Sequence, residues 1–199
     1  MAKRVLVLLV VSLFAVPATA YAATVKVRVE GRTKTIFGPT EVTVTASTPL
    51  EALEQASLLG EFYYHVTPTS YGPYIDQVGR YPAGGSNGWV FKVDDVSPPV
   101  GADADQLKDG DVVLWYWATF GSAGGPPTLD VKAASKKGCY TATAYDDSGK
   151  PTAVGGLTWH VGLKTTVAGT TGTAFCPKAH RGLLVRATAT GAVRSNAVA

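Results

Sequence analysis

The chain has 199 residues, with 18 Lys or Arg and 15 Asp or Glu, so its formal net charge is only +3. A chain this close to neutrality lacks the strongly basic surface of nucleic-acid-binding proteins, and we exclude nucleic acid as a partner. The charge is uneven, since residues 23–127 carry −5 and residues 128–199 carry +6. The basic half either docks on anionic polymers of the cell envelope or is ordinary solvated surface.

The first residues predict a secretory signal peptide over residues 1–22. Lys3 and Arg4 form a basic start, Val5–Val16 is an unbroken apolar run, and Ala18–Ala20 is a small-x-small cleavage site. A membrane anchor is the alternative, but the run falls short of the roughly 20 apolar residues that a spanning helix needs. We expect a mature chain without a transmembrane segment that is secreted, extracellular or loosely associated with the cell surface.

A Gly- and Pro-rich stretch, residues 121–127, indicates a linker between a domain of residues 23–120 and a domain of residues 128–199. Both cysteines, Cys139 and Cys176, lie in the second domain. Export would place them where a disulfide forms and persists, so we expect them to pair.

Local patterns in the first domain predict a hairpin followed by one helix and further strands. Residues 25–30 alternate apolar and polar side chains, as a half-buried strand does, and residues 34–45 predict its partner. Thr48, Pro49 and Glu51 form a helix start with a capping box, and Gly60 is placed to end the helix in a left-handed conformation. Three later apolar or aromatic runs predict strands at residues 61–66, 88–94 and 111–118. This order is typical of a β-grasp-like α+β domain.

The second domain consists of short segments rich in Thr, Val and Ala, separated by Gly-containing turns and without helical periodicity. This pattern predicts a small immunoglobulin-like β-sandwich. The expected main strands are residues 129–134, 139–145, 159–163, 173–176 and 183–189, with the cysteines linking two of them. The fold class is therefore mainly β with one helix.

The sequence offers no convincing catalytic site. We find no nucleophile in an elbow motif, and His65, His160 and His180 have no companion motif. The carboxylates Asp94-Asp95 and Asp109-Gly110-Asp111 permit a glycosidase interpretation, but they stand beside turn formers, where Asp is favoured for backbone reasons. We expect no enzymatic activity, no metal site and no cofactor.

Aromatic residues are unusually frequent in the first domain. Tyr71 and Tyr74 lie among Gly and Pro residues, which predicts a long loop, and aromatic residues on loops favour recognition. Trp117 shares a strand face with Trp115, and this pair either packs on the helix or faces a ligand. The candidate ligand-binding residues are Tyr71, Tyr74, Trp89 and Trp117.

Five segments, in this order, resemble the transcobalamin-like C-terminal domain family of bacterial secreted and surface proteins. They are Val25–Gly31, Thr48–Leu53, Tyr74-Ile75, Gly88–Asp94 and Leu107–Tyr116. The resemblance covers about residues 24–118 and implies a ligand-binding or adhesive module rather than an enzyme. In the animal carriers a similar domain closes over cobalamin, but the helical domain that completes their site is not found in these 199 residues.

Two hypotheses of function follow. The first is a secreted ligand-binding or adhesion module whose partner is a small molecule, such as a corrinoid, or a cell-envelope polymer. The second is a structural envelope scaffold with no small-molecule ligand, in which the aromatic residues are core and the linker spaces two rigid units.

Overall fold

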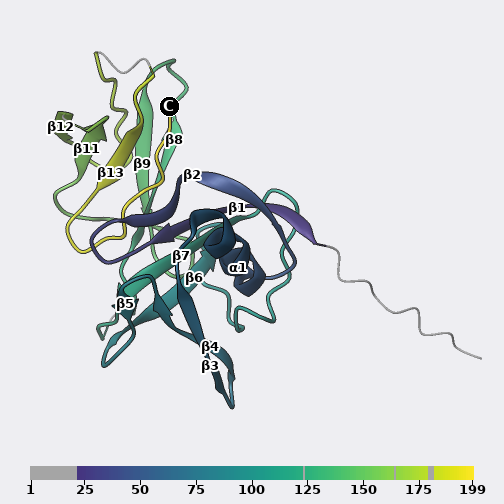
Figure 1. The fold of residues 1–199 in the computed structure, drawn as a ribbon. Coiled ribbons are helices and arrows are strands. Elements are labelled where there is room, and N and C mark those ends of the chain that lie inside the picture. The colour runs from purple at the N-terminus through teal and green to yellow at the C-terminus, as the bar shows by residue number, and fades with distance from the viewer. Residues whose placement is uncertain (1–21, 123, 164, 179–181) are drawn as a thin grey trace, which may run out of the picture.

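The computed structural model describes residues 22–122, 124–163, 165–178 and 182–199. The predicted signal peptide falls on residues 1–21, outside the described residues, apart from its last position. We call residues 23–119 the N-terminal unit and residues 128–199 the C-terminal unit. In Figure 1 the C-terminal unit lies above the N-terminal one.

The N-terminal unit is built on a four-stranded mixed sheet with the strand order β2-β1-β7-β6. The strands are β1 (Ala23–Glu30), β2 (Thr35–Ala46), β6 (Asn87–Val93) and β7 (Val112–Thr119). β1 and β7 are parallel neighbours at the centre, and the outer pairs are antiparallel. Helix α1 (Pro49–Gly60) packs on one face of this sheet (Figure 1). The expected hairpin, helix and further strands are therefore confirmed, and the arrangement is β-grasp-like.

The helix begins where the sequence predicts and ends one residue later than expected. The Thr48 hydroxyl accepts a hydrogen bond from the Glu51 N–H at 3.2 Å, which confirms Thr48 as the N-cap. The left-handed residue at the other end is Glu61, with φ 49°, and not Gly60. Gly60 has a packing role instead, because a Cβ atom there would lie 2.5 Å from the Phe37 ring.

The predicted long loop after the helix is in fact a three-stranded antiparallel sheet. Its strands are β3 (Tyr64–Thr69), β4 (Gly72–Val78) and β5 (Tyr81–Pro82). Pro68 and Pro73 face each other near the turn of the β3–β4 hairpin, at the end of the ladder, where proline is tolerated. Gly and Pro therefore mark a hairpin that projects from the molecule here (Figure 1).

The C-terminal unit forms the expected sandwich-like arrangement of two three-stranded sheets, β10-β9-β8 and β12-β11-β13. Their strands are β8 (Thr128–Ala133), β9 (Tyr140–Tyr145), β10 (Pro151–Thr152), β11 (Thr158–Val161), β12 (Thr165–Ala168) and β13 (Val185–Thr188). A separate apolar core centred on Trp159, Leu129 and Val185 lies within this unit.

The predicted disulfide between Cys139 and Cys176 is present, with an S–S distance of 2.04 Å. The expected strand at residues 173–176 is not formed, since only a single bridge joins Phe175 to Tyr140 at the start of β9. The disulfide thus joins an irregular segment to the residue just before β9 and does not join two strands.

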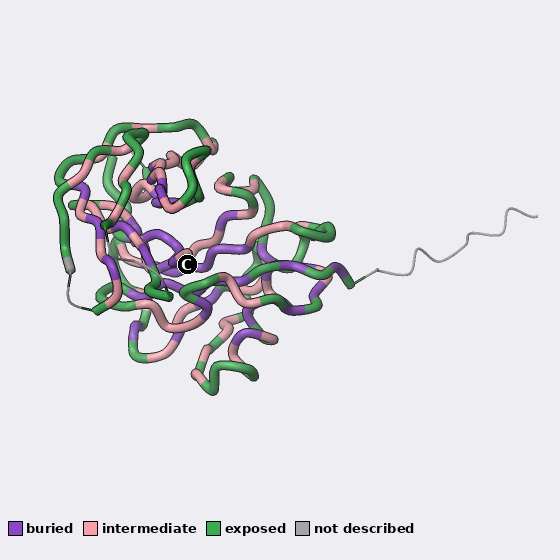
Figure 2. The backbone as a smooth tube through the Cα atoms, turned by 90° about the horizontal axis from the view of Figure 1, so that it is seen from above, coloured by how far each residue is buried: buried purple, intermediate pink, exposed green. Residues whose placement is uncertain are grey.

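The two units share a buried interface on the sheet face opposite the helix. Leu114, Tyr116 and Ala118 of β7 pack there against Val193 of the C-terminal tail. The alternation of β1 predicts that its polar face is exposed, and this is wrong for Glu30, which is completely buried. Figure 2 shows the buried stretches gathered in the middle of the molecule and the exposed ones at the loops around it.

Candidate functional site

A groove of about 370 Å³ opens beside β6, the edge strand of the main sheet. Its lining includes six aromatic side chains and two adjacent polar ones: Tyr74, Trp89, Phe91, Trp115, Tyr116 and Phe120, with Ser97 and Asp147. We call it the aromatic groove. Asp147 comes from the turn between β9 and β10, so the groove draws side chains from both units.

The aromatic side chains divide into an accessible pair and a buried set. Tyr74 is 41% exposed and Phe120 40%, whereas Trp89 and Trp115 are only 3% and 2% exposed. Both indole N–H groups donate to backbone carbonyls, at 2.8 and 2.9 Å, so neither indole has a donor to spare. Among the aromatic side chains of the groove, Tyr74 and Phe120 are therefore the most accessible to a ligand.

The structure brings together two of the four predicted binding residues. Tyr74 and Trp89 both line the aromatic groove. Tyr71 lies at the turn of the β3–β4 hairpin, 96% exposed, and lines none of the cavities described. Trp117 packs edge-on against Trp89, with ring centroids 5.9 Å apart, and lines a separate pocket of about 350 Å³.

Most groove residues are absent from the sequence-based candidates, among them Phe120 and Asp147. Phe120 precedes the Gly- and Pro-rich stretch, a position that predicts only a linker. Asp147 belongs to a turn motif in the other unit, and nothing local indicates that this turn reaches the first unit. The contact between the units brings Asp147 to the groove, whereas Phe120 directly follows β7 and its N–H donates to the Ser86 carbonyl at 2.8 Å.

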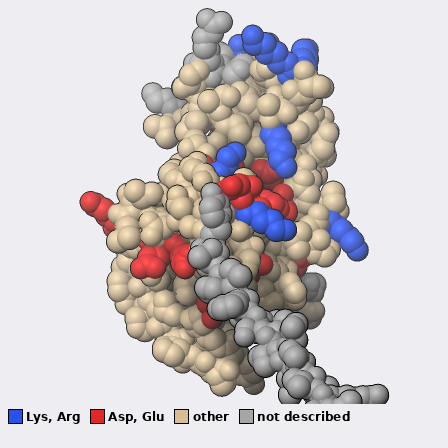
Figure 3. Space-filling view, turned by 90° about the vertical axis from the view of Figure 1, so that its right-hand side faces the viewer, with Lys and Arg blue, Asp and Glu red and all other residues tan. Residues whose placement is uncertain are grey.

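A second cavity, the charged cleft, holds about 500 Å³ between the main sheet and β8. Its charged lining consists of Lys26, Arg28, Glu41, Asp94, Asp95, Asp130 and Lys132. Asp130 and Lys132 form an ion pair at 2.8 Å. Figure 3 views the molecule from a side on which acidic and basic side chains meet near the junction of the two units.

Two carboxylates of the charged cleft have raised pKa values. Burial, together with the negative charge of Asp130, raises the pKa of Asp95 to about 6 from its ordinary 3.8. Burial also raises the pKa of Glu41, although Arg28 opposes it. Both residues have left-handed backbones, with φ 68° at Asp95 and 60° at Glu41. A left-handed backbone costs free energy at residues other than glycine. Backbone strain and the burial of carboxylates thus occur at the same two residues of the charged cleft.

We expect the variant Asp95→Asn to be more stable than the parent near pH 7.5. Because the folded-state pKa of about 6 lies above the ordinary 3.8, the folded protein binds the extra proton, and stability falls as pH rises from about 4 to about 6. The variant should melt about 2 °C or more above the parent at pH 7.5. Asn also favours a left-handed backbone, but that gain is independent of pH.

Thermal unfolding of both proteins at pH 4 and at pH 7.5 separates these effects. An advantage of the variant that is the same at both pH values would contradict a raised pKa at Asp95.

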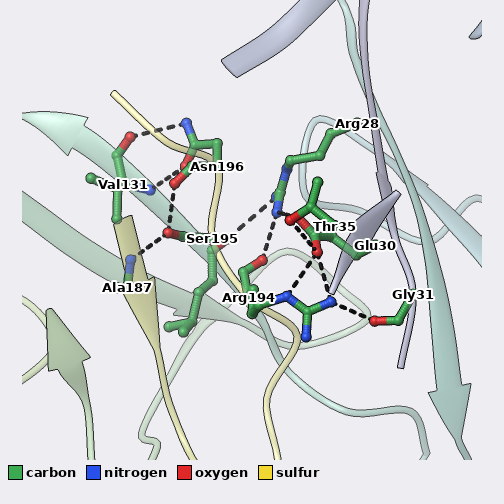
Figure 4. Close-up of polar contacts among 10 residues, drawn as sticks. Arg28, Glu30, Gly31, Thr35, Val131, Ala187, Arg194, Ser195 and Asn196 are labelled. Carbon is green, nitrogen blue, oxygen red and sulfur yellow. Dashed lines mark hydrogen bonds and ion pairs between the residues drawn. The ribbon is translucent and has the colours of Figure 1, made fainter. Parts of the chain in front are cut away.

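An ion network fastens the C-terminal tail to the sheet (Figure 4). The Glu30 carboxylate accepts from Arg28 at 3.2 Å and from Arg194 Nε at 3.0 Å, and the Thr35 hydroxyl lies 3.0 Å from both of its oxygens. Arg28 also donates to the Arg194 carbonyl at 2.6 Å, while its Nε has no partner. Buried charges need such pairing, so Glu30 holds two arginines from opposite sides of the interface.

A buried lysine makes a second polar contact between the units. Lys92 of β6 is fully buried, and its Nζ donates to the Thr128 hydroxyl and to the carbonyls of Tyr145 and Asp146, at 3.1, 3.2 and 2.7 Å. Its nearest carboxylate, Asp147, lies 3.9 Å away. Burial lowers the pKa of Lys92, against the attraction of that carboxylate. Lys92 thus anchors the turn that carries Asp147.

The histidines and the remaining Asp motifs have structural partners. His65 Nδ1 lies 2.7 Å from Asp76, and His160 Nε2 lies 2.8 Å from the Thr188 hydroxyl; His180 is outside the described residues. Three Asp side chains accept from backbone N–H groups at 2.7 to 2.9 Å: Asp94, Asp109 and Asp111. Over the described part of the chain, no group of three or more His, Cys, Asp or Glu could hold a metal ion.

Residues 47–119 match the model of a family described as "Domain of unknown function (DUF4430)". The matched segment contains every groove-lining residue except Phe120 and Asp147. No curated protein matches the sequence. The crystal structure of a candidate metal-binding protein from Ruminococcus gnavus ATCC 29149 is similar at 19% identity with a TM-score of 0.38, over 49% of this chain and 97% of that chain.

Within the described ranges, no helix has both the length and the apolar character needed to cross a membrane.

Proposed function

We propose that this protein is an exported, non-catalytic binding module and that its ligand lies in the aromatic groove. The observation that carries the proposal is that two accessible rings, Tyr74 and Phe120, line one groove together with buried aromatic side chains and a carboxylate. A concave, mainly apolar site with a few convergent polar groups is the usual form of a ligand site. The disulfide supports export, because such bonds persist in oxidising compartments.

The ligand is either a corrinoid or a polymer of the cell envelope. The resemblance to the transcobalamin-like family favours a corrinoid. A groove of about 370 Å³ is near the lower end of small-molecule sites. It would therefore hold part of a corrinoid, with the remainder left to a partner protein. A polymer that binds through one or two of its monomers needs no such partner. We favour an envelope polymer as the ligand for this reason.

We expect Tyr74→Ala and Phe120→Ala each to weaken ligand binding about tenfold, because each removes an accessible ring from the groove. Isothermal titration of the mature chain, residues 23–199, with cyanocobalamin and with soluble envelope polysaccharide measures this loss. Tyr71→Ala is the matched control, since it removes a more exposed tyrosine that lies outside the groove.

Two results would count against the proposal. An equal loss of affinity in Tyr71→Ala would move the site to the tip of the β3–β4 hairpin. Absence of heat with either class of ligand would favour the scaffold function.

A further inference from the structure

We infer that the aromatic groove binds a neutral sugar ring, and that Asp147, supplied by the C-terminal unit, accepts hydrogen bonds from its hydroxyl groups. The inference rests on the proposed function and names the ligand class of the same groove. It also assigns the C-terminal unit a part in binding.

The fold places Asp147 at the groove through its neighbours in the turn. Oδ1 of Asp146 accepts from the backbone N–H groups of Ser148 and Lys150, at 2.9 and 3.0 Å, which closes the turn and leaves the next side chain free to project. Asp147 Oδ2 then accepts from the Gly125 N–H at 3.2 Å. The Gly- and Pro-rich stretch thus packs around this carboxylate. A Cβ at Gly124 or Gly125 would lie 3.2 or 3.4 Å from Asp147 Oδ2, closer than most real Cβ contacts.

The Asp147 carboxylate has acceptor capacity to spare. Its side chain is 43% exposed, and it receives one backbone hydrogen bond, a hydrogen bond from the Tyr116 hydroxyl and a long contact of 3.4 Å from the Ser97 hydroxyl, while Lys92 lies 3.9 Å away. An ionised carboxylate offers about four lone-pair sites. The hydroxyl groups of a ligand can occupy the others.

The charge of the groove excludes anionic ligands. The residues that line it include no Lys, Arg or His, and Asp147 is the one charged side chain among them. Lys92 cannot compensate an anion, because it is fully buried and its Nζ already donates to three protein oxygens. Burial, together with the negative charge of Asp147, raises the pKa of Tyr116. The groove therefore lacks cationic donors, and its side-chain donors are the neutral hydroxyls of Tyr74, Ser97 and Tyr116.

The apolar part of the groove suits the C–H face of a sugar ring. A pyranose ring presents a face of C–H groups and a rim of hydroxyl groups. Aromatic side chains pack on the C–H face, and a carboxylate binds the hydroxyl groups. Tyr74 and Phe120 supply the accessible ring surface. A purely apolar ligand would leave the carboxylate desolvated without a partner, at a cost that disfavours it.

The test is a glycan array of neutral and uronate-containing oligosaccharides, followed by isothermal titration of the mature chain with the strongest neutral binder. We expect saturable binding of neutral glycans, weakened about tenfold or more in Asp147→Asn, because a charge-assisted acceptor is lost. The amide oxygen of Asn can still accept from Gly125, so the turn should stay in place. Glu54→Gln, which neutralises an exposed carboxylate of α1 outside the groove, is the matched control and should bind as the parent does.

The remaining outcomes separate this inference from the proposed function. If no neutral glycan binds but cyanocobalamin does, and Phe120→Ala weakens cyanocobalamin binding, the sugar assignment fails. The aromatic groove is then still the ligand site. Saturable binding of choline that depends on Asp147, without glycan binding, would replace the sugar with a quaternary ammonium ligand. Binding of uronates as strong as that of neutral glycans would overturn the charge argument. No binding by any probe would overturn both proposals.

Discussion

Glu30→Ala should destabilise the protein by about 3–5 kcal/mol, the range for breaking a buried ion pair by removing one partner. The Glu30 carboxylate is fully buried, and it is the shared partner of Arg28 and Arg194. Without it, the buried guanidinium of Arg28 and the partly buried guanidinium of Arg194 lose their shared carboxylate. Urea unfolding followed by tryptophan fluorescence and circular dichroism measures the loss.

The position of the ion network also predicts how cooperatively the variant Glu30→Ala unfolds. Because Arg194 belongs to the C-terminal tail and Arg28 to β1, the variant should lose the contact between the units first, and its single transition should broaden or divide. Glu54→Ala, on an exposed position of α1, is the control and should change stability by no more than about 0.5 kcal/mol. A loss in Glu30→Ala below about 1 kcal/mol, the worth of a surface pair, would contradict a buried network.

Removing the disulfide in the pair Cys139→Ala and Cys176→Ala should cost up to about 4 kcal/mol on the chain-entropy model. The bridge spans 37 residues and is the covalent constraint on a unit with a small core. Alanine is preferred to serine because Cys139 is 2% exposed, and a buried hydroxyl would add its own penalty.

Thermal unfolding with and without a reducing agent supplies the internal control. Reductant should lower the melting temperature of the parent to that of the variant pair and leave the pair unchanged. A parent that melts at the same temperature in both conditions would show that the bridge contributes nothing to stability.

Sequence patterns predicted the local elements well, because each depends on short-range chemistry. The Thr48 cap and its helix, the alternation of β1 and the aromatic run of β7 all appear close to their expected bounds. The hairpin, helix and strand order that makes the N-terminal unit β-grasp-like followed from these elements. The sandwich of the C-terminal unit was likewise predicted from segment length and turn spacing.

Contacts between distant segments could not be predicted in the same way. Alternation in β1 indicates a polar face, and a polar face normally meets water, yet Arg28 and Glu30 of β1 meet the other unit, as does Lys92 of β6. Each of these charged side chains has at least one partner far away in the sequence. Asp147 is missing from the sequence-based site for the same reason, since only the interface carries it to the aromatic groove. Tyr71 was predicted to lie in a long loop because of the Gly and Pro residues around it, and it lies instead at the turn of the β3–β4 hairpin.

The burial of the main sheet on both faces has a consequence for how this chain can be cut or recombined. A fragment that stops before β8 would expose Glu30, Lys92 and the apolar side chains of Leu114 and Tyr116 to solvent. Its surface would then contain an apolar patch with unpaired charges. Such a surface promotes self-association. The matched segment, residues 47–119, is therefore not a portable module in this protein, and grafting it elsewhere would require a new cover for the face that the C-terminal unit occupies.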